Sequence, residues 1–208
     1  MPLFLLVRHG ENNFVKKGRL AGRLPGVHLN EKGIAQAQAV ADALAQRLKE
    51  TPVKAVYSSP MERAMETAVP IGKALGLEVI PRPGLIEVDI GDWQNKTVKG
   101  LSRLKVWRVV QRTPSLFQFP NGESFAHAQH RICDEIQALM QQHDPKDILI
   151  CVSHADPIKL AVSYYIGQPL DLFQRLSVAP ASITTLYVGE MGSNLMALNV
   201  DLAFDFAK

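Results

Sequence analysis

Short apolar runs alternate with longer amphipathic segments along the chain. The runs are rich in leucine, isoleucine and valine, as in strands buried on both faces, whereas the segments repeat their apolar residues with a period near ~3.6. We expect strands at residues 3–8, 53–57, 77–80, 147–152, 182–188 and 195–200. We expect helices at residues 31–49, 60–75, 123–142 and 157–166.

Two of the expected helices carry N-terminal signals. Asn30 is the expected N-cap of the helix over 31–49, and Ser59 that of the next helix. Pro60 would then stand at the first helical position, and Glu62 would complete a capping box. The apolar face of the first helix is given by residues at helical spacing: Ile34, Ala37, Ala41, Leu44, Ala45 and Leu48.

The order of these elements predicts an α/β fold, a three-layer sandwich in which a mainly parallel sheet has helices on both faces. One domain over residues 1–208 is expected for a chain of this length. Residues 81–121 interrupt the alternation with four prolines, three glycines and both tryptophans. We expect this segment to form a lid or substrate-selecting excursion.

Three of the expected strands end at a cation or a histidine. Arg8 and His9 follow the first strand, Arg63 follows the second, and His154 follows the strand over 147–152. Basic side chains at the edge of a core are costly unless they are paired or bind a ligand. Because ligands of parallel sheets lie beyond the carboxyl ends of the strands, these junctions together predict one anion site.

A phosphoryl group is the anion that suits this set of residues best. Arg8 and Arg63 can each present a planar, permanently charged fork to phosphate oxygens. His9 can attack phosphorus as a neutral imidazole and form a phosphohistidine, and His154 can donate to the phosphoryl oxygens. The leaving oxygen then needs a proton, for which Glu87 is the candidate, because its apolar neighbours would raise its pKa.

Charge and composition exclude several other classes. The net charge of +3, from 23 basic and 20 acidic residues, is too small for a nucleic-acid-binding surface, and no basic stripe is present. No apolar run approaches the ~18 residues of a membrane span, and the N-terminus does not resemble a signal peptide. Cys133 and Cys151 are expected to be free and buried, and a cytoplasmic protein is expected. A homodimer is compatible with the sequence and not predicted by it.

Several short motifs share their order and spacing with a known family. They are Arg8-His9-Gly10-Glu11, Gly22-Arg23 with Pro25-Gly26-Val27, Ser58-Ser59-Pro60 with Arg63-Ala64 and Thr67-Ala68, Leu85-x-Glu87 with Gly91-x-Trp93, Gly122-Glu123-Ser124, and Ser153-His154. Over nearly its whole length the chain resembles the histidine phosphatase superfamily, which has the phosphoglycerate mutase-like fold.

The resemblance implies a metal-independent phosphomonoesterase that acts on a small phosphorylated metabolite and needs no cofactor. It implies His9 as the phosphorylated nucleophile and Glu87 as the proton donor, which then serves as the base for water. It also implies a phosphate pocket made by Arg8, Arg63 and His154. Further substrate-binding candidates are Asn12, Gly22, Arg23 and Ala155.

The chain departs from the family pattern at two positions. Members usually carry Thr or Ser at the position of Asn12, and Asn at the position of Val15. That asparagine helps to hold the phosphate, which Val15 cannot do. The amide of Asn12 or Asn13 can donate in its place, and the sequence leaves both open.

Two other functions are alternatives to hydrolysis. A phosphomutase of the phosphoglycerate mutase type would return the phosphoryl group to a bound intermediate. Mutase-type relatives carry extra sequence after the Glu87 motif, and the short segment from Trp93 to Pro120 favours hydrolysis here. A phospho-ligand-binding module without turnover finds support only in Val15.

Other candidate residues have a structural interpretation beside the functional one. Asp89, Asp92 or Glu11 can replace Glu87 as the proton donor. His127, His130 and Asp134 have the spacing of a metal site, but a solvated helix face is favoured. Glu123-Ser124 can touch the substrate or simply begin a helix. Aromatic residues of the excursion can line the substrate mouth or pack within it: Trp93, Trp107, Phe117 and Phe119.

Overall fold

A six-stranded sheet with the order β3-β2-β4-β1-β5-β6 lies at the centre of the computed structural model, which describes residues 2–189 and 192–201. The first four strands of this order run parallel, and β5 and β6 are antiparallel to their neighbours. The strands are β1 (Leu3–Arg8), β2 (Val53–Ser58), β3 (Val79–Pro81), β4 (Ile148–Ser153), β5 (Ile183–Gly189) and β6 (Gly192–Val200).

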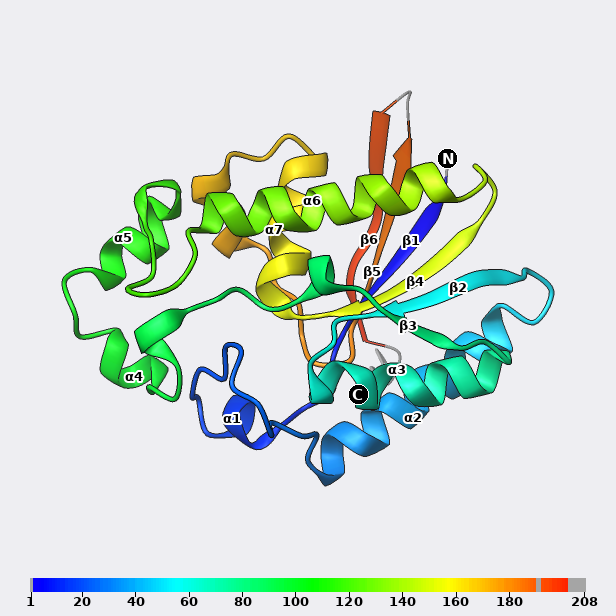
Figure 1. The fold of residues 1–208 in the computed structure, drawn as a ribbon, viewed down its shortest axis with the longest axis horizontal. Helices are drawn as coiled ribbons and strands as arrows, with labels where there is room; N and C mark the ends of the chain where they lie inside the picture. The colour runs from blue at the N-terminus through cyan, green and yellow to red at the C-terminus, as the bar shows by residue number, and fades with distance from the viewer. Residues whose placement is uncertain (1, 190–191, 202–208) are drawn as a thin grey trace, which may run out of the picture.

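Helices cover both faces of this sheet, which confirms the expected fold class (Figure 1). The helices are α1 (Asn13–Lys16), α2 (Glu31–Arg47), α3 (Glu62–Leu75), α4 (Val98–Leu101), α5 (Trp107–Arg112), α6 (Phe125–Gln142) and α7 (Ala155–Tyr165). Short 3-10 turns lie at Pro83–Leu85, Gly91–Trp93, Pro114–Leu116 and Leu170–Arg175. Among the described residues, no helix has the length and apolar character needed to cross a bilayer.

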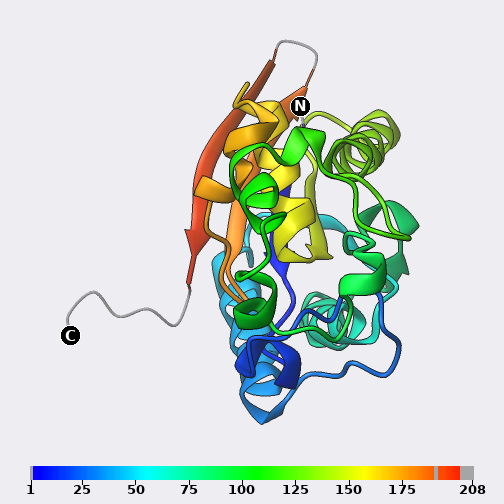
Figure 2. The ribbon, with the colours of Figure 1, turned by 90° about the vertical axis from the view of Figure 1, so that its left-hand side faces the viewer.

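Side chains of β1 point alternately to the two faces of the sheet, and both faces are buried. Phe4 and Leu6 pack into one core with α6 and α7, whereas Leu5 and Val7 pack into a second core with α2 and α3. Successive side chains of a strand point to opposite faces, so an unbroken apolar run fills both cores at once. The antiparallel β5–β6 pair forms one edge of the sheet (Figure 2).

The start of α3 differs from the expected capping box. The helix begins at Glu62 after Met61, and no side chain caps it. The hydroxyl of Ser59 is instead 2.8 Å from His154 Nε2, and the carboxylate of Glu62 accepts a hydrogen bond from the backbone of Gly26. Tertiary partners therefore engage both polar groups that the sequence assigned to the cap.

Two further expectations need correction. On α2 the expected residues Ala37, Ala41 and Leu44 are buried, whereas Ile34 is 60% exposed, and Gly33 and Val40 belong to the buried face as well. Helix α7 begins two residues before Pro157, because a proline in the first turn needs no intrahelical donor.

The excursion over residues 81–121 contains α4, α5 and three 3-10 turns, and in Figure 1 both helices lie at the left, with α4 nearer to α1 and α5 above α4. Its aromatic residues pack against one another. Trp93 stacks on Trp107 with ring centroids 6.1 Å apart, and Phe117 and Phe119 meet edge to face at 4.8 Å. These contacts favour internal packing of the excursion over a lining of the substrate mouth.

The loop after β1 crosses the first turn of α2 at a distance that admits only glycine on both sides. A Cβ on Gly10 would lie 2.5 Å from the carbonyl oxygen of Gly33, and a Cβ on Gly33 would lie 2.0 Å from that of Glu11. Real Cβ atoms do not approach backbone oxygens so closely, so this crossing fixes the loop that follows His9.

We therefore expect Gly33→Ala to lower the free energy of unfolding by about 1–3 kcal/mol, because the loop and α2 must separate. Each kcal/mol should lower Tm by about 2–4 °C in a chain of this size. Thermal unfolding measures the effect. Gly100→Ala, in the exposed helix α4, is the matched control and should leave Tm unchanged or raise it slightly. Equal Tm values for the two variants would contradict the argument.

Candidate active site

The pairing of β1, β2 and β4 brings together the three strand ends that are followed by basic residues. Arg8 pairs with Ser153 in the β1–β4 ladder. The backbone N–H of His9 then donates to Ser153 O at 3.0 Å, and that of Ser59 donates to Val152 O at 2.8 Å. His9, Ser59 and His154 consequently lie at the same edge of the sheet, beyond the ends of adjacent parallel strands.

A cavity of about 210 Å³ opens at this edge. Seven of the residues singled out from the sequence line it: Arg8, His9, Asn12, Gly22, Arg63, Glu87 and Ala155. His154 is fully buried beside the cavity, with its ring centroid 5.1 Å from that of His9. The structure therefore gathers into one site the four basic residues and the carboxyl group that the sequence singled out.

The His9 ring is held with one nitrogen free of a proton. Its Nδ1 lies 2.7 Å from the carbonyl oxygen of Gly10, which can only accept, so Nδ1 carries the hydrogen. Nε2 is the unprotonated nitrogen and accepts a long hydrogen bond, 3.3 Å, from Arg63 Nε. Burial, and then the charges of Arg63 and Arg8, lower the pKa of His9 well below its ordinary value. The ring is thus a neutral imidazole with a lone pair available.

The His154 ring is oriented by Ser59. Ser59 Oγ lies 2.8 Å from His154 Nε2 and also accepts from the backbone N–H of Met61 at 3.4 Å. We assign the Ser59 hydrogen to the bond with Nε2, because Nδ1 faces the Glu87 carboxyl group. His154 Nδ1 then carries the ring hydrogen and points toward Glu87 Oε2, 3.9 Å away. Burial, and then the charge of Arg63, lower the pKa of His154 well below its ordinary value. His154 is therefore a neutral donor.

Glu87 supplies the only carboxyl group, among the described residues, that lies this close to His154. Its side chain is 18% exposed, and its Oε1 accepts a hydrogen bond from the N–H of Val88 at 2.9 Å. Burial raises the pKa of Glu87 to about 7, with the Asp156 carboxylate adding to the effect and Arg63 opposing it. A carboxyl group with such a pKa can both give and take a proton near neutral pH.

Four buried donors of the site have no hydrogen-bond partner within the described part of the chain: Arg8 Nε, Asn12 Nδ2, Arg63 Nη1 and His154 Nδ1. The two guanidinium groups are anchored elsewhere, since Arg8 Nη1 donates to Val178 O at 2.6 Å and Arg63 Nη2 to Gly22 O at 2.7 Å. Leaving such donors unpaired is costly, whereas a multivalent oxyanion would satisfy several of them at once. The arrangement fits a phosphoryl group.

Comparison with known proteins places the chain in a family. A family model described as the histidine phosphatase superfamily (branch 1) matches residues 4–201. The chain belongs to this superfamily. The family expected from the motifs is confirmed, and with it the enzyme class that it implies, a phosphoric monoester hydrolase.

Individual relatives of the histidine phosphatase superfamily carry different names. The chain is 29% identical over 202 residues to phosphoserine phosphatase 1 of Hydrogenobacter thermophilus, covering 96% of this chain and 93% of that protein. It is 28% identical over 200 residues to the 2,3-bisphosphoglycerate-dependent phosphoglycerate mutase of Thermoplasma acidophilum, covering 90% and 88%. A phosphoserine phosphatase of Entamoeba histolytica, solved with 3-phosphoglyceric acid, superposes with a TM-score of 0.82 at 26% identity, covering 96% and 98%.

The other carboxylates weighed against Glu87 are occupied elsewhere in this histidine phosphatase. Glu11 accepts from Asn30 and Lys32, and the hydrogen bond from Asn30 is the main reason that its pKa is lowered. Asp92 accepts from Asn121, and Asp89 lies 3.7 Å from Arg23. None of the three lines the cavity.

Arg23 and Asn13 lie away from the unpaired hydrogen-bond donors of the cavity. The guanidinium of Arg23 binds Glu87 O at 2.8 Å and Glu123 Oε1 at 2.9 Å, behind the Glu87 backbone, and Arg23 is not a lining residue. Asn13 is exposed outside the cavity. Asn12 is buried, caps α1 through its Oδ1 and keeps its amide donor at the cavity, next to Val15. Of the two amides left open by the sequence, only that of Asn12 reaches the site.

The structure also adds residues that the sequence did not indicate as site residues. Arg19, Leu20, Ile90 and Asp156 line the cavity. Asp156 could be inferred from its place two residues after His154, in the first turn of α7. The others carry no motif, because their position depends on how the loop after α1 meets the excursion.

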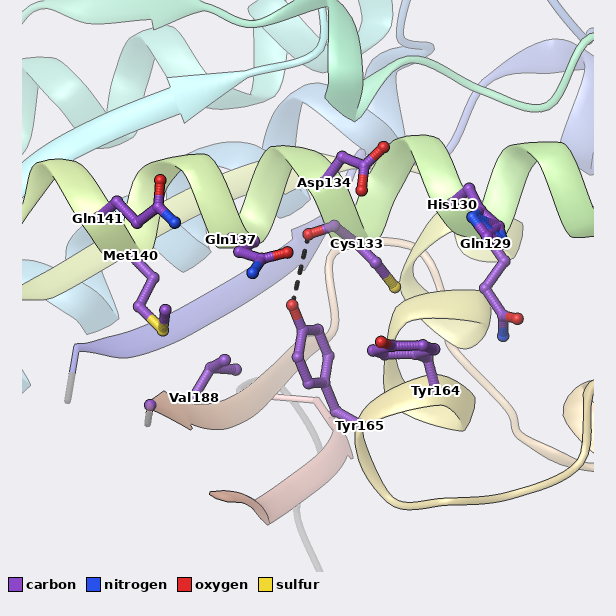
Figure 3. A pocket seen from close by; sticks show the side chains of 11 residues that line it. Gln129, His130, Cys133, Asp134, Gln137, Met140, Gln141, Tyr164, Tyr165 and Val188 are labelled. Carbon is purple, nitrogen blue, oxygen red and sulfur yellow. Dashed lines mark hydrogen bonds between the residues drawn. The ribbon is translucent and has the colours of Figure 1, made fainter. Parts of the chain in front are cut away.

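A larger hollow of about 570 Å³ lies between α6, the end of α7 and β5, away from this site (Figure 3). His130 and Asp134 line it, and the Tyr165 hydroxyl donates to Cys133 O at its floor.

Among the described residues no group of three or more His, Cys, Asp or Glu side chains is placed to hold a metal ion. Cys133 and Cys151 are free and buried, as expected.

We expect Arg63→Lys to weaken the binding of orthophosphate about ten- to a hundredfold. A single ammonium group cannot bind Gly22 O, His9 Nε2 and the anion together, and each lost charged hydrogen bond costs about 1.5–3 kcal/mol. Isothermal titration calorimetry with phosphate measures the change. Arg112→Lys, at the exposed end of α5, is the control and should bind as the unaltered protein does. Equal affinity in both variants would argue against the proposed anion site.

Proposed function

We propose that the chain hydrolyses a phosphomonoester through a phosphohistidine at His9, without a metal ion. The observation that carries the proposal is the unprotonated His9 Nε2 at a cavity where four buried donors have no partner among the described residues. A nucleophile and an anion site that share one cavity, with a carboxyl group of pKa about 7 beside them, make up the parts that phosphoryl transfer needs.

In the first step the lone pair of His9 Nε2 attacks phosphorus. The N–P bond forms as the bond from phosphorus to the ester oxygen breaks, and protonated Glu87 gives its hydrogen to that oxygen, so that an alcohol leaves. Arg8, Arg63, Asn12 and His154 donate to the non-bridging oxygens, whose charge they stabilise in the transition state. The Nδ1–H bond to Gly10 O stabilises the positive ring of the phosphohistidine.

In the second step the Glu87 carboxylate takes a proton from water. The water oxygen attacks phosphorus, the N–P bond breaks and its electron pair returns to His9 Nε2. Inorganic phosphate leaves, His9 is again a neutral imidazole and Glu87 is again protonated. Neither step needs a metal, because the guanidinium groups supply the positive charge.

The size and lining of the cavity support a small phosphorylated metabolite as the substrate. About 210 Å³ holds a phosphoryl group and a few further heavy atoms, and Arg19 and Asp156 offer charges of both signs to them. Relatives named phosphoserine phosphatase are consistent with a substrate of this size. The proposal includes a cytoplasmic protein in which residues 81–121 act as the substrate-selecting segment.

A phosphomutase is the second candidate, and the relative named 2,3-bisphosphoglycerate-dependent phosphoglycerate mutase favours it. No residue from Trp93 to Pro120, all of which the structure describes, lines the cavity, and Glu87 and Ile90 are the lining residues from this part of the chain. Interconversion of phosphoglycerates, assayed with and without a bisphosphate primer, distinguishes the two. Efficient primer-dependent turnover would replace hydrolysis as the assigned function.

We expect hydrolysis of p-nitrophenyl phosphate to persist in excess EDTA and to be abolished by His9→Ala, because the nucleophile is then missing. Acid-sparing gels or mass spectrometry of protein quenched in alkali should show phosphate on the unaltered chain only. His130→Ala, on the exposed side of α6, is the control and should retain full activity. Activity that disappears in EDTA, or that survives His9→Ala, would show the scheme to be wrong.

The pKa of Glu87 near 7 predicts the direction of the pH dependence. Glu87 must be protonated to act as the acid, so kcat/KM should fall as the pH rises through about 7. Asp156→Asn removes a negative charge that raises this pKa, so the fall should begin at lower pH. The pH profile of kcat/KM for an alkyl phosphate, whose leaving group needs the proton, measures the shift. Asp134→Asn should not move the profile, and a shift to higher pH in Asp156→Asn would contradict the assignment.

A further inference from the structure

The segment that carries Glu87 has no strand or helix to hold it. Residues 86–90 lie between two 3-10 turns and run alongside α6 (Figure 1). Buried backbone groups outside regular structure still need partners, and a proton donor must be held to within a fraction of an ångström to be effective. Side chains supply several of the contacts that replace a ladder here.

Two guanidinium groups bind the carbonyl oxygens of this segment. Arg131, on α6, donates to Gly84 O at 2.9 Å and to Ile86 O at 2.8 Å, and its Nη2 lies 3.4 Å from Glu87 O. Arg23 donates to Glu87 O at 2.8 Å from the loop after α1. The carbonyl of the proton donor is therefore held between two cations.

A single carboxylate oxygen links these two cations. Glu123 Oε1 accepts from Arg23 Nη2 at 2.9 Å, from Arg131 Nη2 at 2.8 Å and from the backbone N–H of Asp89 at 2.9 Å. The Glu123 side chain is 7% exposed, and its backbone N–H donates to Asp89 O at 2.9 Å. A buried carboxylate with three donors on one oxygen is stabilised by them and in turn holds together two cations that would otherwise repel each other.

We propose that Glu123 is a positioning residue, which clamps Arg23 and Arg131 onto the Glu87 backbone and thereby fixes the proton donor opposite the leaving oxygen. Glu123 does not line the cavity, whereas Arg8 and Arg63, which would bind the phosphoryl oxygens, do. Its effect is therefore confined to the role of Glu87. The inference rests on the proposed function, in which Glu87 protonates the leaving group.

The test compares two esters that differ in their need for an acid. An alkyl phosphate has a poor leaving group and needs the proton from Glu87, whereas p-nitrophenyl phosphate leaves as a stable anion. Glu123→Ala should reduce kcat for the alkyl ester at least tenfold more than for the aryl ester. Glu123→Gln keeps an acceptor oxygen without the charge. It should also reduce kcat more for the alkyl ester than for the aryl ester, but by a smaller factor than Glu123→Ala.

A double-mutant cycle separates positioning from general damage. In a Glu87→Gln background the acid is already missing, so Glu123→Ala should cause no further loss in the alkyl-to-aryl ratio. The inhibition constant of vanadate should change less than about threefold, because the phosphate donors are untouched. Equal losses on both esters, or full additivity with Glu87→Gln, would overturn the proposal.

A readout without turnover makes the proposal independent of the proposed function. In hydrogen-exchange mass spectrometry, both Glu123 variants should lose protection over residues 86–90 and keep it over residues 8–10 and 153–155. Loss of protection across the whole chain, or none over 86–90, would again overturn it. If the unaltered protein hydrolyses neither ester, the proposed function fails, and the exchange pattern still decides whether Glu123 holds this segment.

Discussion

The parallel pairing of β1 with β4 is the constraint on which the site depends. Arg8 lies opposite Ser153, and a slip of one residue would turn the core side chains of β1 to the wrong faces. The two apolar cores therefore fix the register, and the register fixes where His9 and His154 leave the sheet. Packing chemistry far from any ligand thus sets the 5.1 Å separation of the two imidazoles.

The buried cations have two effects that reinforce each other. Arg8 and Arg63 present donors that an oxyanion can accept, and their charges add to burial in lowering the pKa of His9, which keeps its Nε2 unprotonated. The same surroundings act on Glu87 in the opposite direction. Burial and the Asp156 carboxylate raise the pKa of Glu87, while Arg63 lowers it. One electrostatic environment thus keeps an imidazole neutral and a carboxyl group able to exchange its proton.

The fold and the central residues were predictable because they depend on local signals. Unbroken apolar runs identified β1 and β4, and the basic residues that follow the strands predicted which side chains meet at one edge of the sheet. The errors arose where a distant partner decides. Ser59 serves His154 instead of a helix cap, Ile34 lies beside the buried stripe of α2, and Arg131 meets Glu87 only because α6 packs along that segment. No spacing along the chain carries those contacts.

The position of β1 in the sheet also bears on how the protein is made. Leu3 pairs with Ile148 on one side and Tyr187 on the other, so β1 leaves the ribosome well before either of the strands with which it pairs. Such non-local pairing gives a high contact order and slow folding, with an apolar strand exposed meanwhile. His9 is thus translated well before the strand beside it in the sheet, β4, is available to position it.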